Sequence, residues 1–497
     1  MLRKIALATL LLSGVAHAAP PSEVARSTAK YARAKYGEQV INSLASMVTY
    51  NTVADPKIPF ETNPHHIGFK KFLKEEAERL GFDYEDSGWV VVIGYGKGTE
   101  RVGVVTHGDV QPVDPSKWKQ SPFKLDRTSE PGKLLARGSE DDKGPIATAL
   151  YAMKAIKDKK VKLNKRIELY VYMGEESDWT ALEEYIKTHK LPEVNITLDA
   201  EYPVVTAEKG WGALMMTLPP VQGGAPQGPV LSEFTGGFFG SQIPEDAVAV
   251  IDNATPELAE QIRKRGAAQK GMQYSFTQEG QRLRIKAKGL SAHSSKPEDG
   301  VNAIGMLADA LAVRSWEGTQ AGNMASLINE LIGTGLYGEK FGKAAYSDDF
   351  MGPMTVSPTV LKQTDKGLEL NVNLRRPRGK AGPELQAQFE SAFNAWKAQR
   401  APEATLRAII GEPWLRPDAP QIPTLLNVFS HYTGIKDAKP VSIGGGTNSR
   451  LFPNAVSFGP AMPGSVYTGH SEHEFITTKQ LMLNLEMYTA VLVELAR

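Results

Sequence analysis

Side chains that can bind metal ions gather at the ends of apolar, strand-like runs and on glycine-rich loops of this chain. The six residues are, in chain order, His107, Asp141, Glu175, Glu176, Asp199 and His470. Their oxygen and nitrogen atoms are the ligands that a catalytic zinc site without cysteine uses. Carboxylates brought together away from water repel one another and need cations to neutralise them. The pattern therefore predicts a hydrolytic site with two metal ions.

Composition limits the other classes of function. The chain has 497 residues, a formal net charge of +1 and no cysteine. Its length allows at least one large core and favours two domains. The balanced, interspersed charge gives no electrostatic footprint for nucleic acid and fits the binding of small molecules better. Without cysteine there is neither a disulfide framework nor a thiolate metal site, so histidines and carboxylates must hold any metal.

The first eighteen residues have the pattern of a signal peptide. Residues 1–4 carry two basic side chains, residues 5–15 form an apolar run, and Ala16-His17-Ala18 is a small-x-small cleavage site. We expect residues 1–18 to be removed and the remaining chain to be periplasmic or secreted, with no membrane contact after cleavage. The alternative is an amphipathic first helix of the mature fold. The apolar run is too short to span a bilayer.

Helices and strands alternate along the first half of the chain. Helical spacing covers residues 23–47, 69–80 and 145–156, and β-branched or apolar runs cover residues 89–93, 102–106, 166–173 and 194–198. This order predicts an α/β fold with a mostly parallel sheet and helices on both faces. Ligands bind beyond the carboxyl ends of the strands in such sheets, where His107, Glu175, Glu176 and Asp199 all fall.

The hydrophobic pattern of the sequence changes between residues 211 and 382. Runs such as residues 247–251 and 282–287 alternate or carry charge on one face, which is typical of an antiparallel sheet with one wet face. We therefore expect an inserted α+β domain at residues 211–382, a lid that binds substrate. The catalytic domain would comprise residues 19–210 and 383–497.

The individual signals each allow a simpler interpretation. His107 could be a structural histidine, although Asp109, two residues later on an extended chain, could orient its ring. The three acids that include Asp141 precede a helix and could cap it, but their repulsion would be relieved if one bridged two metal ions. Glu175 and Glu176 could form a surface turn; alternatively, one binds metal while the other takes a proton from water.

The chain closely resembles the co-catalytic zinc exopeptidases, which include bacterial glutamate carboxypeptidases, aminoacylases, succinyl-diaminopimelate desuccinylases and carnosinase-type dipeptidases. The matching stretches read HGDVQPV at residues 107–113, DDKGP at 141–145, GEES at 174–177 and DAEYP at 199–203, followed by His470 with Glu474 and Phe475. They span most of the chain in the order that the family shows.

This resemblance implies two Zn²⁺ ions, with Mn²⁺ or Co²⁺ as possible substitutes, and a role for each residue. Asp141 would bridge both ions. His107 and Asp199 would complete one site, and Glu176 and His470 the other. Glu175 would be the general base and later the general acid, and Asp109 would hold His107.

Three further stretches resemble the family's substrate-binding residues. The sequence GLSAHS at residues 289–294 would supply His293 to the oxyanion, although this histidine could instead cap the following helix. In NLRRP at 373–377, Arg375 would bind the substrate carboxylate, with Arg376 one position away as the competing choice. In GGGTN at 444–448, Gly445, Thr447 and Asn448 would lie beside that carboxylate, unless the stretch is only a tight turn.

Two departures from the family pattern bear on the substrate. Residues 241–244 read SQIP where relatives often have asparagine before a Val-Pro step. The insert is also long, as in the monomeric PepV-type dipeptidases, so we expect a monomer. The sequence thus predicts an exported dizinc dipeptidase that acts on small peptides with a metal-activated water. The alternatives are an N-acyl amino acid hydrolase or carboxypeptidase with the same site, and an inactive periplasmic binding protein.

Overall fold

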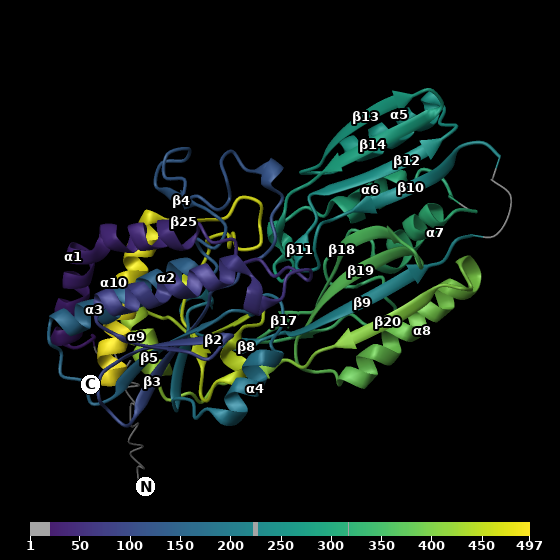
Figure 1. Cartoon of the computed structure of the whole chain (residues 1–497). Helices are drawn as coiled ribbons and strands as arrows, with labels where there is room; N and C mark the ends of the chain where they lie inside the picture. Colours follow the sequence, from purple (N-terminus) through teal and green to yellow (C-terminus); the bar gives the residue numbers. More distant parts are fainter. Residues whose placement is uncertain (1–19, 222–226, 317) are drawn as a thin grey trace, which may run out of the picture.

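The computed structural model describes residues 20–221, 227–316 and 318–497, which form two domains with separate cores (Figure 1). The expected signal peptide, residues 1–18, lies outside the described residues. The first domain is a layered α/β unit, and the second is built on one long antiparallel sheet. Each of these two architectures was expected from the sequence.

The sheet of the first domain carries the site. Its strand order is β1-β2-β5-β3-β6-β23-β8-β21, and β22 also pairs with β8. The strands are β1 (Asp83–Asp86), β2 (Val90–Tyr95), β3 (Arg101–His107), β5 (Arg166–Tyr172), β6 (Val194–Thr197), β8 (Val205–Glu208), β21 (Trp414–Leu415), β22 (Val441–Ile443) and β23 (Val456–Ser457).

The centre of this sheet is parallel and its flanks are antiparallel. Strands β5, β3, β6 and β23 run parallel to one another, as the alternation of strands and helices predicts. On one side β2 pairs antiparallel with both β1 and β5, and on the other β8 pairs antiparallel with β23 and β21. The four parallel strands therefore direct their carboxyl ends to one edge.

Helices cover both faces of this sheet. The larger core lies under α1 (Glu23–Met47), α2 (Pro64–Leu80), α3 (Lys143–Asp158), α9 (Ile422–Thr433) and α10 (Thr478–Ala496). A smaller core lies under α4 (Thr180–Thr188) on the other face. Residues of β2 alternate between the two cores: Val91 and Ile93 face the first, whereas Val90 and Val92 face the second. Within the described ranges, no helix has both the length and the apolarity needed to span a bilayer.

The second domain is the lid. Its eight strands have the order β13-β14-β12-β10-β18-β19-β9-β20 and pair antiparallel throughout. They are β9 (Gly210–Leu218), β10 (Val230–Gly236), β12 (Asp246–Asp252), β13 (Gln273–Glu279), β14 (Arg282–Lys288), β18 (Thr355–Thr364), β19 (Gly367–Arg376) and β20 (Thr405–Ile410). The helices are α5 (Pro256–Ala267), α6 (Ala303–Leu311), α7 (Gln320–Leu327) and α8 (Gly382–Arg400).

The lid ends later than the sequence suggested. A boundary between residues 382 and 383 would assign α8 and β20 to the catalytic domain. However, Phe389 and Phe393 of α8 are buried in the lid core, and β20 pairs with β9 along the edge of the lid sheet. The lid therefore extends from Gly210 to about Ile410. The misplacement has a simple cause: the apolar spacing of a helix does not reveal which of two sheets it packs on.

Candidate metal centre and substrate cavity

The fold brings all six candidate residues together at the carboxyl edge of the parallel strands. His107 is the last residue of β3, Glu175 and Glu176 follow β5, and Asp199 follows β6. Asp141 lies just before α3. His470 comes from the long loop between β24 (Pro460–Ala461) and β25 (Phe475–Thr477).

Asp141 lies between the two histidines and offers a different oxygen to each. Its Oδ1 is 2.8 Å from Nε2 of His107, and its Oδ2 is 3.2 Å from Nε2 of His470. Asp199 Oδ2 lies 3.7 Å from His107 Nε2, and Glu176 Oε1 lies 3.0 Å from His470 Nε2. The residues thus form two adjacent donor sets that share one carboxylate.

Backbone atoms fix the ring of His107, which differs from the expected arrangement. Nδ1 of His107 donates to the carbonyl oxygen of Asp109 at 3.0 Å, which directs Nε2 toward Asp141 and leaves Nε2 as the ring atom that a metal ion would take. The Asp109 carboxylate is 3.5 Å from that ring and instead accepts the backbone N–H groups of Glu175 and Glu176, both at 3.0 Å. Asp109 therefore positions the glutamate pair as well as the histidine. Because β3 ends at His107, the extended geometry assumed for residue 109 does not apply.

Two polar side chains to which the sequence assigned no role also hold the candidate ligands. Tyr467 Oη donates to Asp141 Oδ2 at 2.7 Å, and Gln111 Nε2 donates to Glu176 Oε2 at 2.6 Å. Such partners orient ligating side chains and tune their basicity. Gln111 lies in the stretch after His107 that resembles the family, so the sequence did contain a pattern that could have indicated its role. No local pattern marks Tyr467; only the fold brings it to Asp141.

The charges of this cluster fit bound cations. Burial and then the charge of Asp199 raise the pKa of Glu175 well above its usual range, and burial also raises the pKa of Asp199. His107, Asp141 and Glu176 offer ligand atoms that all lie within 4.8 Å of one another, as do His107, Glu175 and Asp199. Four carboxylates against two imidazoles leave a negative excess that divalent cations would neutralise. The chain's residues therefore fit metal ions at this position.

Glu175 is the carboxylate least committed to a partner. Its Oε1 is shielded from solvent and has no hydrogen-bond partner among the described residues. Its backbone is held from both sides, because its N–H donates to Asp109 and its carbonyl accepts Trp179 Nε1 at 2.7 Å. A fixed backbone with an unengaged oxygen suits a group that moves protons.

His293 reaches the site from the lid. It lies on the short strand β15 (Ala292–His293), and its ring centroid is 4.3 Å from that of His470. Its Nδ1 accepts the backbone N–H of Ser295 at 3.0 Å, and burial lowers its pKa well below the usual range. The ring is therefore neutral with its proton on Nε2, ready to donate a hydrogen bond.

Arg375 is a buried cation on β19 with only neutral partners. Its exposed fraction is 4%, and its guanidinium donates to Asn373 Oδ1 at 3.0 Å and Ser294 Oγ at 3.4 Å. No carboxylate of the described residues forms an ion pair with it. Arg376, the competing candidate, forms an ion pair with Glu412, so its charge already has a partner. An uncompensated buried guanidinium is suited to a carboxylate ligand.

The glycine loop contributes less directly than the sequence suggested. Gly445 and Thr447 line a cavity at the site, but Thr447 donates both its N–H and its hydroxyl to Glu208. Asn448 is buried and lines neither of the two cavities described below. At Gly444 a Cβ atom would lie 2.4 Å from the carbonyl oxygen of Ser295, so glycine there permits close approach of the lid.

Two cavities meet at the cluster of candidate residues. The first is lined by Asp141, Asp199, Glu201, Lys296 and Tyr467 among others. The second is lined by Trp179, Trp211, Phe239 and Arg375 among others. Glu175, Glu176, His293, Gly446 and His470 line both. The site can therefore hold an extended small molecule that passes across the metal ligands.

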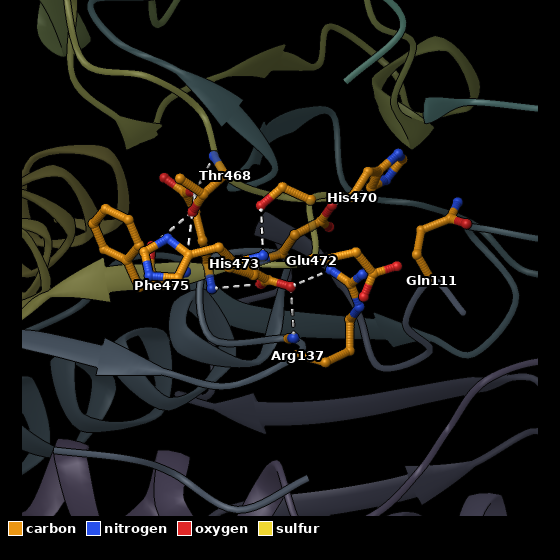
Figure 2. A network of polar contacts seen from close by, with 12 residues as sticks. Gln111, Arg137, Thr468, His470, Glu472, His473 and Phe475 are labelled. Atoms are coloured by element: carbon orange, nitrogen blue, oxygen red, sulfur yellow. Dashed lines mark hydrogen bonds and ion pairs between the residues drawn. The ribbon is translucent and has the colours of Figure 1, made fainter. Parts of the chain in front are cut away.

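A buried ion pair joins the two loops that carry Asp141 and His470 (Figure 2). Glu474 Oε2 accepts Arg137 Nη1 at 2.6 Å and the N–H of Gly138 at 3.0 Å. Its Oε1 accepts the N–H groups of Glu140 and Asp141 at 2.9 and 3.1 Å. In return, Glu140 Oε2 accepts the N–H and hydroxyl of Thr468, both at 2.7 Å. This reciprocal clamp sets the distance between the shared carboxylate and the second histidine.

We expect Glu474→Gln to destabilise the chain and to loosen the metal site. The amide would place an NH₂ group against N–H donors and leave Arg137 buried and unpaired, at a cost of about 3–5 kcal/mol. Metal affinity should fall by roughly 10- to 100-fold, because the N–H of Asp141 loses its acceptor. Denaturant unfolding in a chelator measures the first effect, and metal titration of the folded protein measures the second.

The matched control is Glu130→Gln, which breaks two partly exposed ion pairs, with His473 and with Lys133. Pairs of this kind contribute about 0–1 kcal/mol, so stability and metal affinity should change little. Equal effects of the two substitutions would contradict the role assigned to the clamp.

The comparisons with known proteins identify the family and the fold of this chain. The family model described as "Peptidase family M20/M25/M40" matches residues 103–494 of this chain. The Beta-Ala-Xaa dipeptidase of Lactobacillus delbrueckii subsp. lactis is 28% identical over 467 residues, covering 93% of this chain and 96% of that protein. Human carnosine dipeptidase 1 has a similar fold, with a TM-score of 0.60, 14% identity and coverage of 96% and 99% of the two chains. The dipeptidase Dug1p of Saccharomyces cerevisiae gives a TM-score of 0.58, 15% identity and coverage of 94% and 98%. The chain is thus a metallopeptidase that belongs to peptidase family M20/M25/M40.

Proposed function

We propose that this protein is a dizinc dipeptidase. The observation that carries the proposal is the placement of the metal ligands, Glu175, His293 and the uncompensated Arg375 around two connected cavities. Arg375 closes one end with a cation, which suits a substrate with a free carboxylate one residue beyond the scissile bond. The similarity to a Beta-Ala-Xaa dipeptidase along nearly the whole chain supports the same class of substrate.

Zinc is the proposed metal because the donor set contains imidazole and carboxylate and no thiolate. Two ions are proposed because Asp141 turns one oxygen to each histidine. Bound zinc would polarise the scissile carbonyl and acidify the attacking water. Mn²⁺ or Co²⁺ could substitute, since both accept the same ligands.

Three residues of the chain would then each carry out one part of the hydrolysis. Glu175 takes a proton from the attacking water and later delivers it to the leaving amine. His293 donates from Nε2 to the oxygen that becomes negative, and its tautomer is set in advance by Ser295. Arg375 holds the carboxylate end, so that the amide lies beside Glu175.

The role of Arg375 can be tested by removing either partner of the expected contact. In the wild type, replacing the free carboxylate of a dipeptide by an amide should lower kcat/KM by about 100-fold, because a buried charge pair loses one member. In Arg375→Ala, kcat/KM for the dipeptide with a free carboxylate should already be as low as that of the wild type for the amide. Amidation of the substrate should then lower kcat/KM little further. Steady-state kinetics of the four combinations measure the coupling.

A suitable control is Arg407→Ala, a lid substitution on β20 that is not part of either cavity. It should retain the full penalty for amidation. If the Arg375→Ala enzyme still discriminated 100-fold against the amide, another group would have to bind the carboxylate.

We further propose that residues 1–18 act as a signal peptide and that the chain works outside the cytoplasm. The support is the basic start, the apolar run and the Ala16-His17-Ala18 site. Intact mass of the protein recovered from the periplasm or medium should correspond to a chain beginning at Ala19. Recovery of only the full-length chain, inside the cell, would overturn this proposal.

We also propose a monomer. The lid of a single chain already forms an eight-stranded sheet in which β13, β14, β12 and β10 meet the other four strands through the pairing of β10 with β18. Light scattering after size exclusion should give the mass of one chain. A mass of two chains at working concentrations would contradict it.

A further inference from the structure

The second cavity has an aromatic wall that the proposed chemistry does not use. Trp211 and Phe239 come from the lid, and Trp179 comes from the catalytic domain. Trp211 is 44% exposed, which is high for a large apolar side chain. Exposed apolar surface gathered inside a cavity is typical of a site that binds an apolar group.

The geometry links this wall to Arg375. Strand β9 pairs antiparallel with β19, and Trp211 is directly opposite Arg375 in the register. Opposite residues of paired strands project from the same face of a sheet, and both of these line the second cavity. Phe239 also lines this cavity, with its ring centroid 6.1 Å from that of His470. A residue whose carboxylate is held by Arg375 therefore places its side chain among these rings.

The remaining charges of the cavity do not offer a second anion site. Arg450 also lines the cavity, but its three guanidinium nitrogens already donate to Glu208 and to the carbonyl oxygens of Glu412 and Lys209. Of the two arginines that line this cavity, only Arg375 has no carboxylate partner among the described residues. An acidic substrate side chain in this cavity would thus be buried without a free cation, whereas an apolar ring would pack against the aromatic side chains of the wall.

We propose that the cavity wall formed by Trp179, Trp211 and Phe239 is a subsite for a large apolar or aromatic side chain on the substrate residue that bears the free carboxylate. This inference rests on the proposed dipeptidase function and specifies its substrate class. Dipeptides of the form Xaa-Phe, Xaa-Trp or Xaa-Leu are then preferred over Xaa-Gly and Xaa-Glu. The first residue of the substrate contributes little to this preference, since its side chain lies on the other side of the metal ligands.

Kinetics with Ala-Gly, Ala-Leu, Ala-Phe, Ala-Glu and Ala-Lys test the subsite. In the wild type, kcat/KM for Ala-Phe should exceed that for Ala-Gly by at least about tenfold, the discrimination typical of an apolar pocket. In Trp211→Ala and Phe239→Ala this ratio should fall several-fold. The matched control is Phe350→Ala: Phe350 is a 41% exposed phenylalanine of the lid that is not part of the cavity wall, so the ratio should stay unchanged.

A second measurement needs no variant. Free L-phenylalanine should inhibit hydrolysis of Ala-Gly at a concentration at least about tenfold lower than glycine does, since both present a carboxylate to Arg375. Equal rates for all five dipeptides, or a preference for Ala-Glu or Ala-Lys, would overturn the subsite and leave the dipeptidase function intact. Absence of hydrolysis for every dipeptide would contradict the function itself and the subsite with it.

Discussion

Glu175→Gln should reduce dipeptide hydrolysis by roughly 10²- to 10⁴-fold while the metal content stays that of the wild type. The amide has nearly the same shape as the carboxylate but can neither accept the proton of the attacking water nor return it to the leaving amine. Glu175 differs from its neighbour Glu176, whose Oε1 is 3.0 Å from His470 Nε2. Steady-state kinetics and elemental analysis of the same preparation measure the two quantities.

Glu183→Gln is the matched control for this experiment. Glu183 is exposed on α4, only a short distance along the chain, and does not line either cavity. Its substitution should alter neither rate nor metal content. Near-wild-type turnover in Glu175→Gln would remove Glu175 from the chemistry, and loss of metal would make it a ligand instead.

Asp141→Asn should strongly reduce hydrolysis for a different reason, because it removes the carboxylate that both histidines share. Asparagine retains one acceptor oxygen and replaces the other by an NH₂ group, which cannot bind a cation. At most one of the two donor sets would stay complete. Loss of several kcal/mol of charge stabilisation corresponds to about 10³-fold in rate. Elemental analysis should show less than the wild-type metal content.

The control for Asp141 is Asp83→Asn, at the exposed end of β1, where the side chain pairs with Arg166 at the surface. Surface pairs contribute about 0–1 kcal/mol, so metal content and rate should match the wild type. An Asp141→Asn protein that holds the wild-type amount of metal would show that the ions do not share this carboxylate.

The positions of the central strands could be predicted because their sequences are unambiguous. The run at residues 166–173 became β5 (Arg166–Tyr172), and the run at 194–198 became β6 (Val194–Thr197). Both are short, apolar and bounded by turns, so hydrophobic patterning suffices. Since they alternate with helices, their parallel pairing and shared carboxyl edge also followed. That is why the residues after them could be expected to meet.

Other features depend on tertiary contacts that leave no local pattern. Strand β23 (Val456–Ser457) has two residues, too few for any periodicity, yet it completes the parallel centre. Helix α8 has the same apolar spacing whichever domain it joins. The contact of Tyr467 with Asp141 spans more than three hundred residues. Likewise, Trp211 and Phe239 converge only because the lid sheet and the loop after β10 fold toward the metal ligands.

The assignment as a metal-dependent dipeptidase is tested most directly by comparing substrates in one assay. Purified protein would be incubated with dipeptides, the same dipeptides acetylated at the amine, N-acyl amino acids and tripeptides, before and after chelation and after zinc is restored. Unmodified dipeptides should be hydrolysed fastest, activity should disappear with the chelator, and zinc should restore it. Preferential hydrolysis of N-acyl amino acids or tripeptides, or dipeptide hydrolysis that survives complete removal of metal, would contradict the proposed function.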